Sequence, residues 1–391
     1  MKKMSLFQII LVSVFGAVAV AAVLVFALAV GGSSSTSVGA VQIWGTLDET
    51  AFNTVIRQTL ETDTRLSQVV YVQKPEGTYI NELTNALAAG KGPDLFLLRQ
   101  DYVYLEAPKL VPIPSASLSV TQFQNTFVEA ANPFIAESGI LAIPLSVDPL
   151  VLYWNKDLMS SSGYAKPPQY WDELYDMART ITKRNTAGSI TKSAISFGEY
   201  SNVTNAKDIM SLLILQAGGL ITTRDQAGKV IPAISPRTGD TTQATPSALR
   251  FFTEFSDPSK DDYTWSRSRP QSQQSFAAGD VALYIGYASE QPLINSLNPN
   301  LNFSVAAIPQ IRGAATSINT GRAYGFSVPR TSSNPSGAFT VAYILAATGV
   351  SQSLSLALGM PSARRDVLSL PAQGDDQLFN KQAIIARTWV D

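Results

Sequence analysis

The chain has 391 residues, with 29 lysines and arginines against 30 aspartates and glutamates, and it contains no cysteine and no histidine. A nearly neutral chain without a basic run beyond Lys2-Lys3 lacks the charge needed to neutralise phosphates, so no nucleic-acid function is expected. The missing residue types exclude disulfides, thiolate nucleophiles, Ser-His-Asp triads and zinc sites built on imidazole or thiolate. No cofactor and no metal are therefore expected, whereas glycosidase chemistry with two carboxylates stays open.

The beginning of the chain predicts a membrane segment. Residues 7–30 carry no charge, and at about 1.5 Å per residue a helix of this length exceeds the ~30 Å hydrocarbon core of a bilayer. Because residues 27–29 (Ala-Leu-Ala) also offer a cleavage site, residues 1–31 are either an uncleaved membrane anchor or a removed signal segment. The two lysines keep the N-terminus cytoplasmic, so everything after a flexible linker at 32–40 is expected on the outer side of the membrane.

The next hundred residues predict the order β-α-β-α-β. The expected elements are a strand over 38–44, a helix marked by Phe52, Val55, Ile56 and Leu60 behind an Asp48 cap, a strand over 69–73, a helix marked by Tyr79, Ile80, Leu83 and Leu87, and a strand over 95–98. Strands apolar on both faces and separated by amphipathic helices indicate a parallel sheet covered on both sides. Binding sites are then expected beyond the carboxyl ends of the strands.

The rest of the chain repeats this alternation less regularly and predicts a second α/β domain. The expected elements are helices around 174–181, 209–216 and 249–255, strands over 281–285, 303–308 and 325–328, and helices around 339–346 and 352–358. Residues 222–245 are rich in Gly, Thr and Pro and predict an extended surface excursion.

Taken in order, several motifs resemble the extracellular solute-binding proteins of ABC importers, in the family that includes maltose-binding protein. The motifs are VQIWGT, AAGKGPDLFLL, GILAIPLSVDPLVLYWNKDL, PPQYWDELYDMARTI, SFAAGDVALYIGYAS, AAIPQ, YGFSVP and GMPSARRDV, spread over residues 41–391. The resemblance implies a two-lobed α/β fold of the type II periplasmic-binding-protein class, and the uncharged segment 7–30 predicts an N-terminal transmembrane helix before it. It places residues 41–147 and 326–347 in lobe I, and residues 148–322 and 352–391 in lobe II.

The resemblance also implies a function. The chain would be the extracytoplasmic substrate-binding component of an ABC transporter, a monomer that closes over a small solute, a sugar being favoured, and is then recognised by a membrane permease. The family has no catalytic residues, so no enzyme activity is expected. A membrane-anchored glycosidase, and a surface receptor or adhesin on the same scaffold, remain alternatives.

Asp148 is the first candidate for ligand binding, because it interrupts an almost wholly apolar stretch where the resemblance places the first crossing between lobes. A carboxylate there could accept hydroxyl hydrogen bonds from a polyol; alternatively, it caps or turns the chain before Pro149. Tyr153 and Trp154 follow in the same stretch. Since neighbours in a strand face opposite ways, at most one of them is expected to line the cleft.

Other candidates lie where strands end. Trp44 ends the first strand, and Tyr287 and Glu290 follow a later one, so these residues would face the cleft unless the rings pack in the core. Tyr324, between two glycines, would lie at the second crossing as a hinge residue and a ligand contact.

Two weaker candidates complete the set. Asp101 follows the third strand and either contacts ligand or pairs with Arg99. Trp265 is a loop tryptophan that could contact ligand or serve only in surface packing.

Overall fold

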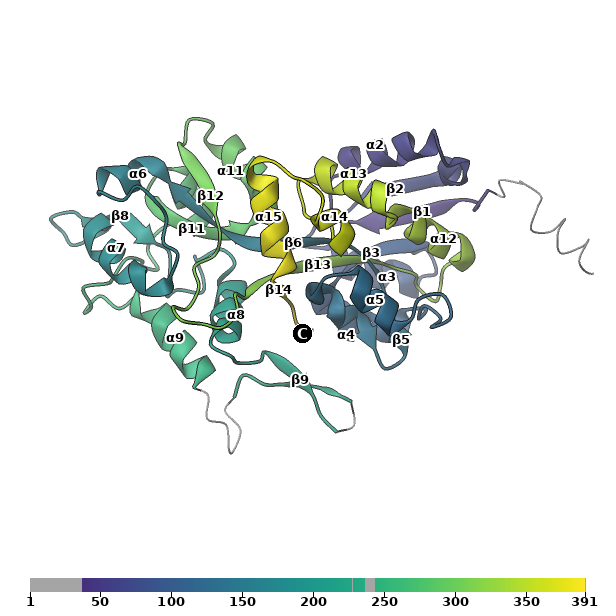
Figure 1. Cartoon of the computed structure of the whole chain (residues 1–391), viewed down its shortest axis with the longest axis horizontal. Coiled ribbons are helices and arrows are strands. Elements are labelled where there is room, and N and C mark those ends of the chain that lie inside the picture. The colour runs from purple at the N-terminus through teal and green to yellow at the C-terminus, as the bar shows by residue number, and fades with distance from the viewer. Residues whose placement is uncertain (1–36, 227, 236–242, 391) are drawn as a thin grey trace, which may run out of the picture.

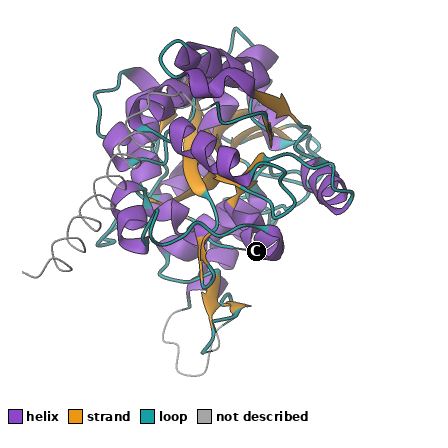
Figure 2. Ribbon diagram, turned by 90° about the vertical axis from the view of Figure 1, so that its right-hand side faces the viewer, coloured by secondary structure: helices purple, strands orange, loops and turns teal. Residues whose placement is uncertain are grey.

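The computed structural model describes residues 37–226, 228–235 and 243–390. The expected N-terminal membrane segment lies outside these residues. Two lobes lie side by side, joined in the middle by the long strands β6 (Ile143–Asn155) and β13 (Asn319–Ser327) (Figure 1). Helices pack on both sides of the strands (Figure 2). The fold is thus the two-lobed α/β arrangement that the sequence predicts.

A single sheet of ten strands runs through both lobes in the order β2-β1-β3-β13-β6-β11-β8-β7, with β12 paired to β6 and β14 paired to β13. The further strands are β1 (Val41–Gly45), β2 (Val69–Gln73), β3 (Leu95–Arg99), β7 (Lys183–Arg184), β8 (Ile190–Ile195), β11 (Val281–Tyr287), β12 (Phe303–Ala306) and β14 (Ala386–Arg387). Two short hairpins lie outside this sheet: β4 (Ile135–Ala136) with β5 (Gly139–Ile140), and β9 (Thr222–Arg224) with β10 (Val230–Pro232).

The N-terminal β-α-β-α-β order is confirmed, because β1 pairs in parallel with both β2 and β3. The Asp48 side chain accepts a hydrogen bond from the backbone N–H of Ala51 and so begins α2 (Glu49–Leu60), as its position predicts. The apolar face of α2 packs on the sheet, where the Phe52 and Tyr71 rings stack with centroids 4.1 Å apart.

The other helices cover the two halves of the sheet. Their bounds are α3 (Tyr79–Ala88), α4 (Val103–Glu106), α5 (Val120–Thr126), α6 (Lys156–Ser161), α7 (Leu174–Ile181), α8 (Ala206–Gln216), α9 (Ala244–Glu254), α10 (Ser272–Ala277), α11 (Gln291–Leu297), α12 (Pro335–Leu345), α13 (Thr348–Leu358), α14 (Arg365–Leu368) and α15 (Gly374–Ile384). Short 3-10 segments are η1 (Thr64–Gln68), η2 (Gln100–Tyr102), η3 (Ala107–Lys109), η4 (Glu129–Phe134), η5 (Trp171–Glu173) and η6 (Ala288–Glu290).

Two separate hydrophobic cores underlie the two lobes. In β6, Leu145 and Val147 belong to the first core, whereas Leu150 and Leu152 belong to the second. The strand changes partners at the same place, since it pairs with β13 up to Pro149 and with β11 from Leu150 onward. The chain therefore crosses from one lobe to the other at Asp148-Pro149.

The C-terminal part packs differently from the expectation that placed residues 352–391 in lobe II. Leu354, Met360 and Leu368 belong to the first core, and Phe379 of α15 belongs to the second. The helical pattern of these segments predicts that they have an apolar face, but it does not say which core that face meets. In the structure, the C-terminal segments join both lobes.

Among the residues that the structure describes, no single helix is long and apolar enough to cross a membrane. Only α12 and α13 taken together, bent by 74° where they meet, pass this test of length and composition.

Candidate ligand-binding site

The two crossing strands bring four side chains to one face. In the antiparallel register of β6 and β13, Asp148 is opposite Arg322 and Ser146 is opposite Tyr324. Directly opposed residues point to the same side of a sheet, and so do residues two apart in one strand. Asp148, Ser146, Arg322 and Tyr324 therefore share one face of the crossing, and we call this group with its neighbours the crossing site.

Asp148 lies inside a strand of 13 residues and is 2 % exposed. The backbone N–H of Ser289 donates to Asp148 Oδ1 at 3.0 Å, and the Ser289 hydroxyl donates to Oδ2 at 2.5 Å. Burial raises the pKa of Asp148 to about 6, although these hydrogen bonds and the charge of Arg322 oppose the shift. The alternative that Asp148 ends or turns the chain before Pro149 is wrong, because β6 continues to Asn155.

Arg322 is the centre of the site. Its guanidinium carbon lies 4.0 Å from the centroid of the Tyr287 ring, within cation–π range. Its nitrogens lie 3.6 Å from a carboxylate oxygen of Glu76, which precedes α3 of lobe I, and 3.8 Å from one of Asp208 on α8 of lobe II. Burial alone would lower the pKa of Arg322, but the neighbouring tyrosines, Asp208 and Glu76 raise it well above the usual value, so the group stays charged.

Buried hydroxyl groups face the same region. The Tyr287 side chain is 2 % exposed, and within the described residues neither its hydroxyl nor that of Ser146 has a hydrogen-bond partner. Burial raises the pKa of Tyr287 well above its usual value; Arg322 opposes this shift, and the nearby Asp208 adds to it. Burial likewise raises the pKa of Tyr324 to about 12, and Arg322 opposes the rise. All these phenols are neutral at physiological pH and can both donate and accept.

The wall on the lobe I side is an ion-pair network. Arg99 pairs with both carboxylate oxygens of Asp101, at 2.7 and 2.8 Å, and with Glu76 at 2.8 Å. Asp101 is thus in the ion pair that the sequence offered as its alternative role. The Arg99 guanidinium also lies 4.9 Å from the Tyr102 ring centroid.

A small cavity lies between this wall and the crossing. It has a volume of about 20 Å³ and is lined by Thr46, Glu76, Tyr79, Ile80, Leu97, Arg99, Tyr102 and Tyr324. One water molecule needs roughly 10–15 Å³ by this kind of measure, so the cavity has room for about one water. It has no room for a solute the size of a sugar ring.

Glu290, a predicted ligand contact, is already saturated by the protein. Its carboxylate accepts hydrogen bonds from the side chains of Asn205 at 2.7 Å, Gln273 at 2.6 Å and Tyr284 at 2.5 Å, and from the backbone N–H of Tyr287 at 3.0 Å. These bonds hold η6, and with it Ser289, against the end of β11. Glu290 therefore positions the residue that binds Asp148.

Two predicted contacts are core residues instead. Trp265 is fully buried in the second core, and its indole N–H donates to Asn202 Oδ1 at 3.0 Å. Tyr153 is also fully buried there, with its hydroxyl donating to the backbone carbonyl of Tyr287 at 2.6 Å. Trp265 fails as a ligand contact because an aromatic residue in a loop packs inward as readily as it lines a cleft. Tyr153 takes the core position that strand alternation leaves to one of Tyr153 and Trp154.

The other two tryptophans predicted as ligand contacts, Trp44 and Trp154, are not brought to the crossing site. Trp154 is half-buried six residues along β6 from Asp148, which is about 20 Å at ~3.3 Å per residue. Trp44 is half-buried in lobe I, where its indole N–H donates to Gln42 Oε1 and the Lys74 ammonium lies 4.0 Å from its ring centroid. Neither ring lines the small cavity.

Sequence reasoning missed Arg322, Ser289, Glu76 and Asp208. Arg322 carries a usable signal, since it precedes Tyr324 by two residues in a strand and must share its face. Glu76 lies in the loop before α3, Ser289 in the short 3-10 segment η6 and Asp208 in the first turn of α8. At such positions the periodicity of the sequence does not say which distant element a side chain meets.

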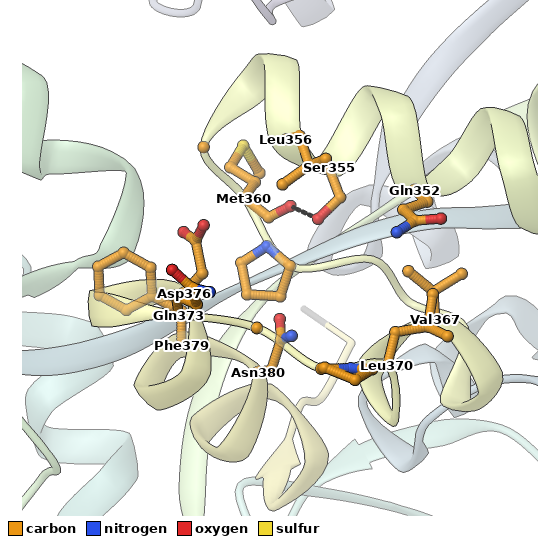
Figure 3. Close-up of a pocket in the computed structure, with 14 residues that line it drawn as sticks. Gln352, Ser355, Leu356, Met360, Val367, Leu370, Gln373, Asp376, Phe379 and Asn380 are labelled. Carbon is orange, nitrogen blue, oxygen red and sulfur yellow. Dashed lines mark hydrogen bonds between the residues drawn. The ribbon is translucent and has the colours of Figure 1, made fainter.

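Three larger cavities lie elsewhere among the described residues. The first, of about 620 Å³, is lined by residues of α4 and of the β9–β10 hairpin. The second, of about 440 Å³, lies beside α8 and α9 and is lined mainly by apolar residues with Tyr200, which is 78 % exposed, and Trp389. The third, of about 370 Å³, lies between α13, α14 and α15, where the Ser355 hydroxyl bonds to the Met360 carbonyl (Figure 3). The Asn319 side chain of β13 donates a hydrogen bond to Gln382 of α15. Because Asn319 and Arg322 are three residues apart in the strand, they face opposite sides of the sheet, so α15 covers the side of the crossing away from Arg322.

Comparison with known sequences gives two kinds of relative. A binding protein of Brucella abortus (strain 2308) is 23% identical over 240 residues, which are 60% of this chain and 54% of that protein. The maltotriose-binding protein of Pyrococcus abyssi is 30% identical over 113 residues, 28% of this chain and 23% of that protein. The chain thus spans about half the length, or less, of these curated relatives.

Solved structures of similar fold cover most of the chain. The cyclic α-maltosyl-1,6-maltose binding protein of Arthrobacter globiformis has a TM-score of 0.72 at 15% identity, covering 90% of this chain and 88% of the other. A cyclo/maltodextrin-binding protein in complex with maltotetraose has a TM-score of 0.70 at 18% identity, covering 89% and 86%. At these identities the likeness shows the shared two-lobed fold.

The family described as "Bacterial extracellular solute-binding protein" matches residues 60–347, well over half of the chain. This match includes β6, β11 and β13, and with them Asp148, Tyr287 and Arg322. The chain belongs to the bacterial extracellular solute-binding proteins.

Proposed function

We propose that the protein is the extracytoplasmic sugar-binding component of an ABC importer and that it binds its ligand at the crossing site without catalysing a reaction. The observation that carries this proposal is the convergence of Asp148, Tyr287, Arg322 and Tyr324 at the place where both strands pass between the lobes. These residues come from the strands β6, β11 and β13, which are far apart in the chain.

The chemistry of the crossing site suits a polyol. A sugar offers flat C–H faces and a rim of hydroxyls that donate and accept hydrogen bonds. Asp148 would accept from those hydroxyls, Arg322 would donate to them, and the unpartnered hydroxyls of Tyr287 and Ser146 can do either. An aromatic ring that newly buries 150–250 Å² against a sugar face contributes a few kcal/mol at about 25 cal/mol per Å², compared with about 1 kcal/mol for a neutral hydrogen bond.

The binding cycle would be a hinge motion. Arg322 lies near Glu76 of lobe I and Asp208 of lobe II, so an open form would admit the sugar and a closed form would hold it from both lobes. The apolar cavity at Tyr200 and Trp389 would hold further rings of an oligosaccharide. The structural relatives named above bind maltotetraose and a cyclic maltosyl-maltose, and this supports a glucose-based ligand.

The cellular setting follows from the family. An N-terminal anchor formed by residues 7–30 would tether the protein to the outer side of the membrane, and a permease would recognise the closed monomer. Removal of residues 1–31 as a signal segment is the other outcome that the sequence allows.

Thermal unfolding of the full-length chain with added sugars tests the function. The protein is kept in a detergent without a sugar headgroup, because maltoside detergents would compete for the site. A ligand at 100 times its dissociation constant adds about 2.7 kcal/mol of stability and raises the midpoint by a few degrees. We expect a maltooligosaccharide to do so for the wild type and not for R322M. If amino acids or peptides raise the midpoint and no glycan does, the sugar assignment is wrong.

A further inference from the structure

Arg322 is a half-buried cation whose side chain makes no hydrogen bond to the described residues. The guanidinium carries five N–H donors, yet within the described residues the nearest carboxylate oxygens lie at 3.6 Å from Glu76 and 3.8 Å from Asp208, beyond hydrogen-bond range. The side chain is only 25 % exposed. Arg99, which shares Glu76 with Arg322, differs in this respect, because its hydrogen bonds to Asp101 and Glu76 are all 2.8 Å or shorter.

Because these N–H donors have no protein acceptor and the side chain is partly exposed, they are available to a ligand. A ligand acceptor would have to lie within hydrogen-bond reach of the guanidinium, on the face of the crossing that Arg322 shares with Asp148. The Tyr287 ring, 4.0 Å from the guanidinium carbon, restrains the guanidinium through a cation–π contact. A planar fork held in this way favours two adjacent acceptor atoms, such as the vicinal hydroxyls of a sugar or the two oxygens of a carboxylate.

The charges around Arg322 discriminate between these two acceptors. Glu76 and Asp208 already balance its charge, and Asp148 is its direct neighbour across the strands. With Asp101 and Glu290, the wider site holds five carboxylates, the others being Glu76, Asp208 and Asp148. It holds two arginines, Arg99 and Arg322. A carboxylate on the ligand would therefore enter a region with excess negative charge, where like charges 4 Å apart repel by about 4 kcal/mol at an effective dielectric constant of 20.

We propose that Arg322 is a specificity-determining residue that binds vicinal hydroxyls of uncharged saccharides, and that Glu76 and Asp208 make it reject saccharides carrying a carboxylate. The inference rests on the proposed sugar-binding function and adds the class of sugar. Glu76 comes from lobe I and Asp208 from lobe II, whose α8 packs in the second core. The rejection of acidic sugars is thus complete only when both lobes contact Arg322, in the closed form.

The test compares pairs of sugars that differ only at C6: glucose with glucuronate, galactose with galacturonate, and the trisaccharides of each pair. Isothermal titration calorimetry on the full-length chain at pH 7.5, where uronates are ionised, measures both dissociation constants. For the pair that binds, we expect the wild type to bind the neutral sugar at least 100-fold more tightly than the uronate. In the double variant E76Q/D208N the preference should fall at least tenfold, because Arg322 then carries an unbalanced charge.

The ratio of two affinities is insensitive to a general loss of folded protein, so it separates specificity from structural damage. R322M should weaken the neutral sugar at least tenfold and keep or strengthen the preference over the uronate, because Glu76 and Asp208 then lack their balancing charge. If the wild type prefers the uronate, or if E76Q/D208N leaves the ratio unchanged, the inference is overturned while sugar binding stands. If no neutral sugar and no uronate binds, the proposed function itself fails and the inference fails with it.

Discussion

Gly321 lies directly against the backbone of Asp148 where the two crossing strands meet. A Cβ atom placed on Gly321 would lie 2.6 Å from the carbonyl oxygen of Asp148 and 3.0 Å from the Cα of Pro149. Real Cβ atoms do not approach backbone atoms so closely, and neither neighbour is a flexible side chain. The close approach of the two strands, which brings Arg322 beside Asp148, therefore depends on glycine at position 321.

The variant G321A should consequently separate β13 from β6 at the crossing. Overpacking of this kind costs about 1–3 kcal/mol, and we expect that loss in the free energy of unfolding together with weaker sugar binding. Chemical denaturation and calorimetry measure the two effects. The control is G349A, since Gly349 lies in α13 with no heavy atom within 4 Å of the added Cβ. If G321A and G349A change the free energy of unfolding and the sugar affinity equally, the close approach of the two strands does not depend on glycine at position 321.

Much of the fold and part of the site could be predicted from the sequence, because periodic patterns report which way a side chain points. The apolar run around Asp148 predicts a buried strand, and a buried strand containing a carboxylate predicts a special site. Tyr324 follows from the glycines on either side of it. Arg322 follows from Tyr324 through the two-residue period of a strand, a step that the resemblance alone does not supply.

The failures have a physical reason as well. Burial of an aromatic residue can be predicted, but its neighbours come from elements distant in the chain, so Trp265 was assigned to the ligand and lies in the core. Glu290 was expected at the ligand for its position after β11, and its four donors come from four separate residues. Likewise, the helical pattern after residue 352 does not say that α13 packs on lobe I.

The raised pKa of Asp148 predicts an unusual dependence of stability on pH. The folded value is about 6 against an unfolded value of about 3.9, so the folded state binds more protons between these pH values. Stability from this group is present below pH 4 and is lost as pH rises through 6, by up to about 3 kcal/mol for two pKa units. D148N lacks this titration, so its unfolding free energy relative to the wild type should increase from pH 4 to pH 7.

Asp366 provides a control of opposite sign for this experiment. Its hydrogen bond with Arg364 lowers the pKa of Asp366 to about 2, so the stability it contributes is present above pH 4 and is lost as pH falls towards 2. Urea denaturation of D148N and of D366N at a series of pH values measures both effects. Parallel profiles of D148N and the wild type would show that burial does not raise the pKa of Asp148.

The position of Glu290 predicts a structural role. In E290Q at least one of the four donors would meet the N–H₂ group of the amide in place of an oxygen, and we expect the free energy of unfolding to fall by about 2–4 kcal/mol. The control is E129Q, because Glu129 pairs with Arg387 at 3.3 Å on the surface, where such pairs contribute about 0–1 kcal/mol. A loss of sugar affinity in E290Q without a loss of stability would return Glu290 to the set of ligand contacts.

The indole of Trp265 offers a direct test of whether this residue belongs to the core or to the ligand site. W265F keeps an aromatic ring but removes the N–H that donates to Asn202, whose own amide holds the backbone carbonyls of Ser266 and Arg269. A buried acceptor without its donor, together with lost volume, should lower the free energy of unfolding by about 1–3 kcal/mol. Because the ring is fully buried, the dissociation constant of the sugar should stay within twofold of the wild type. W154F, at a half-buried ring outside the crossing site, is the matched control and should change neither quantity by a comparable amount. A sugar affinity that falls in W265F while stability is kept would place Trp265 at the ligand after all.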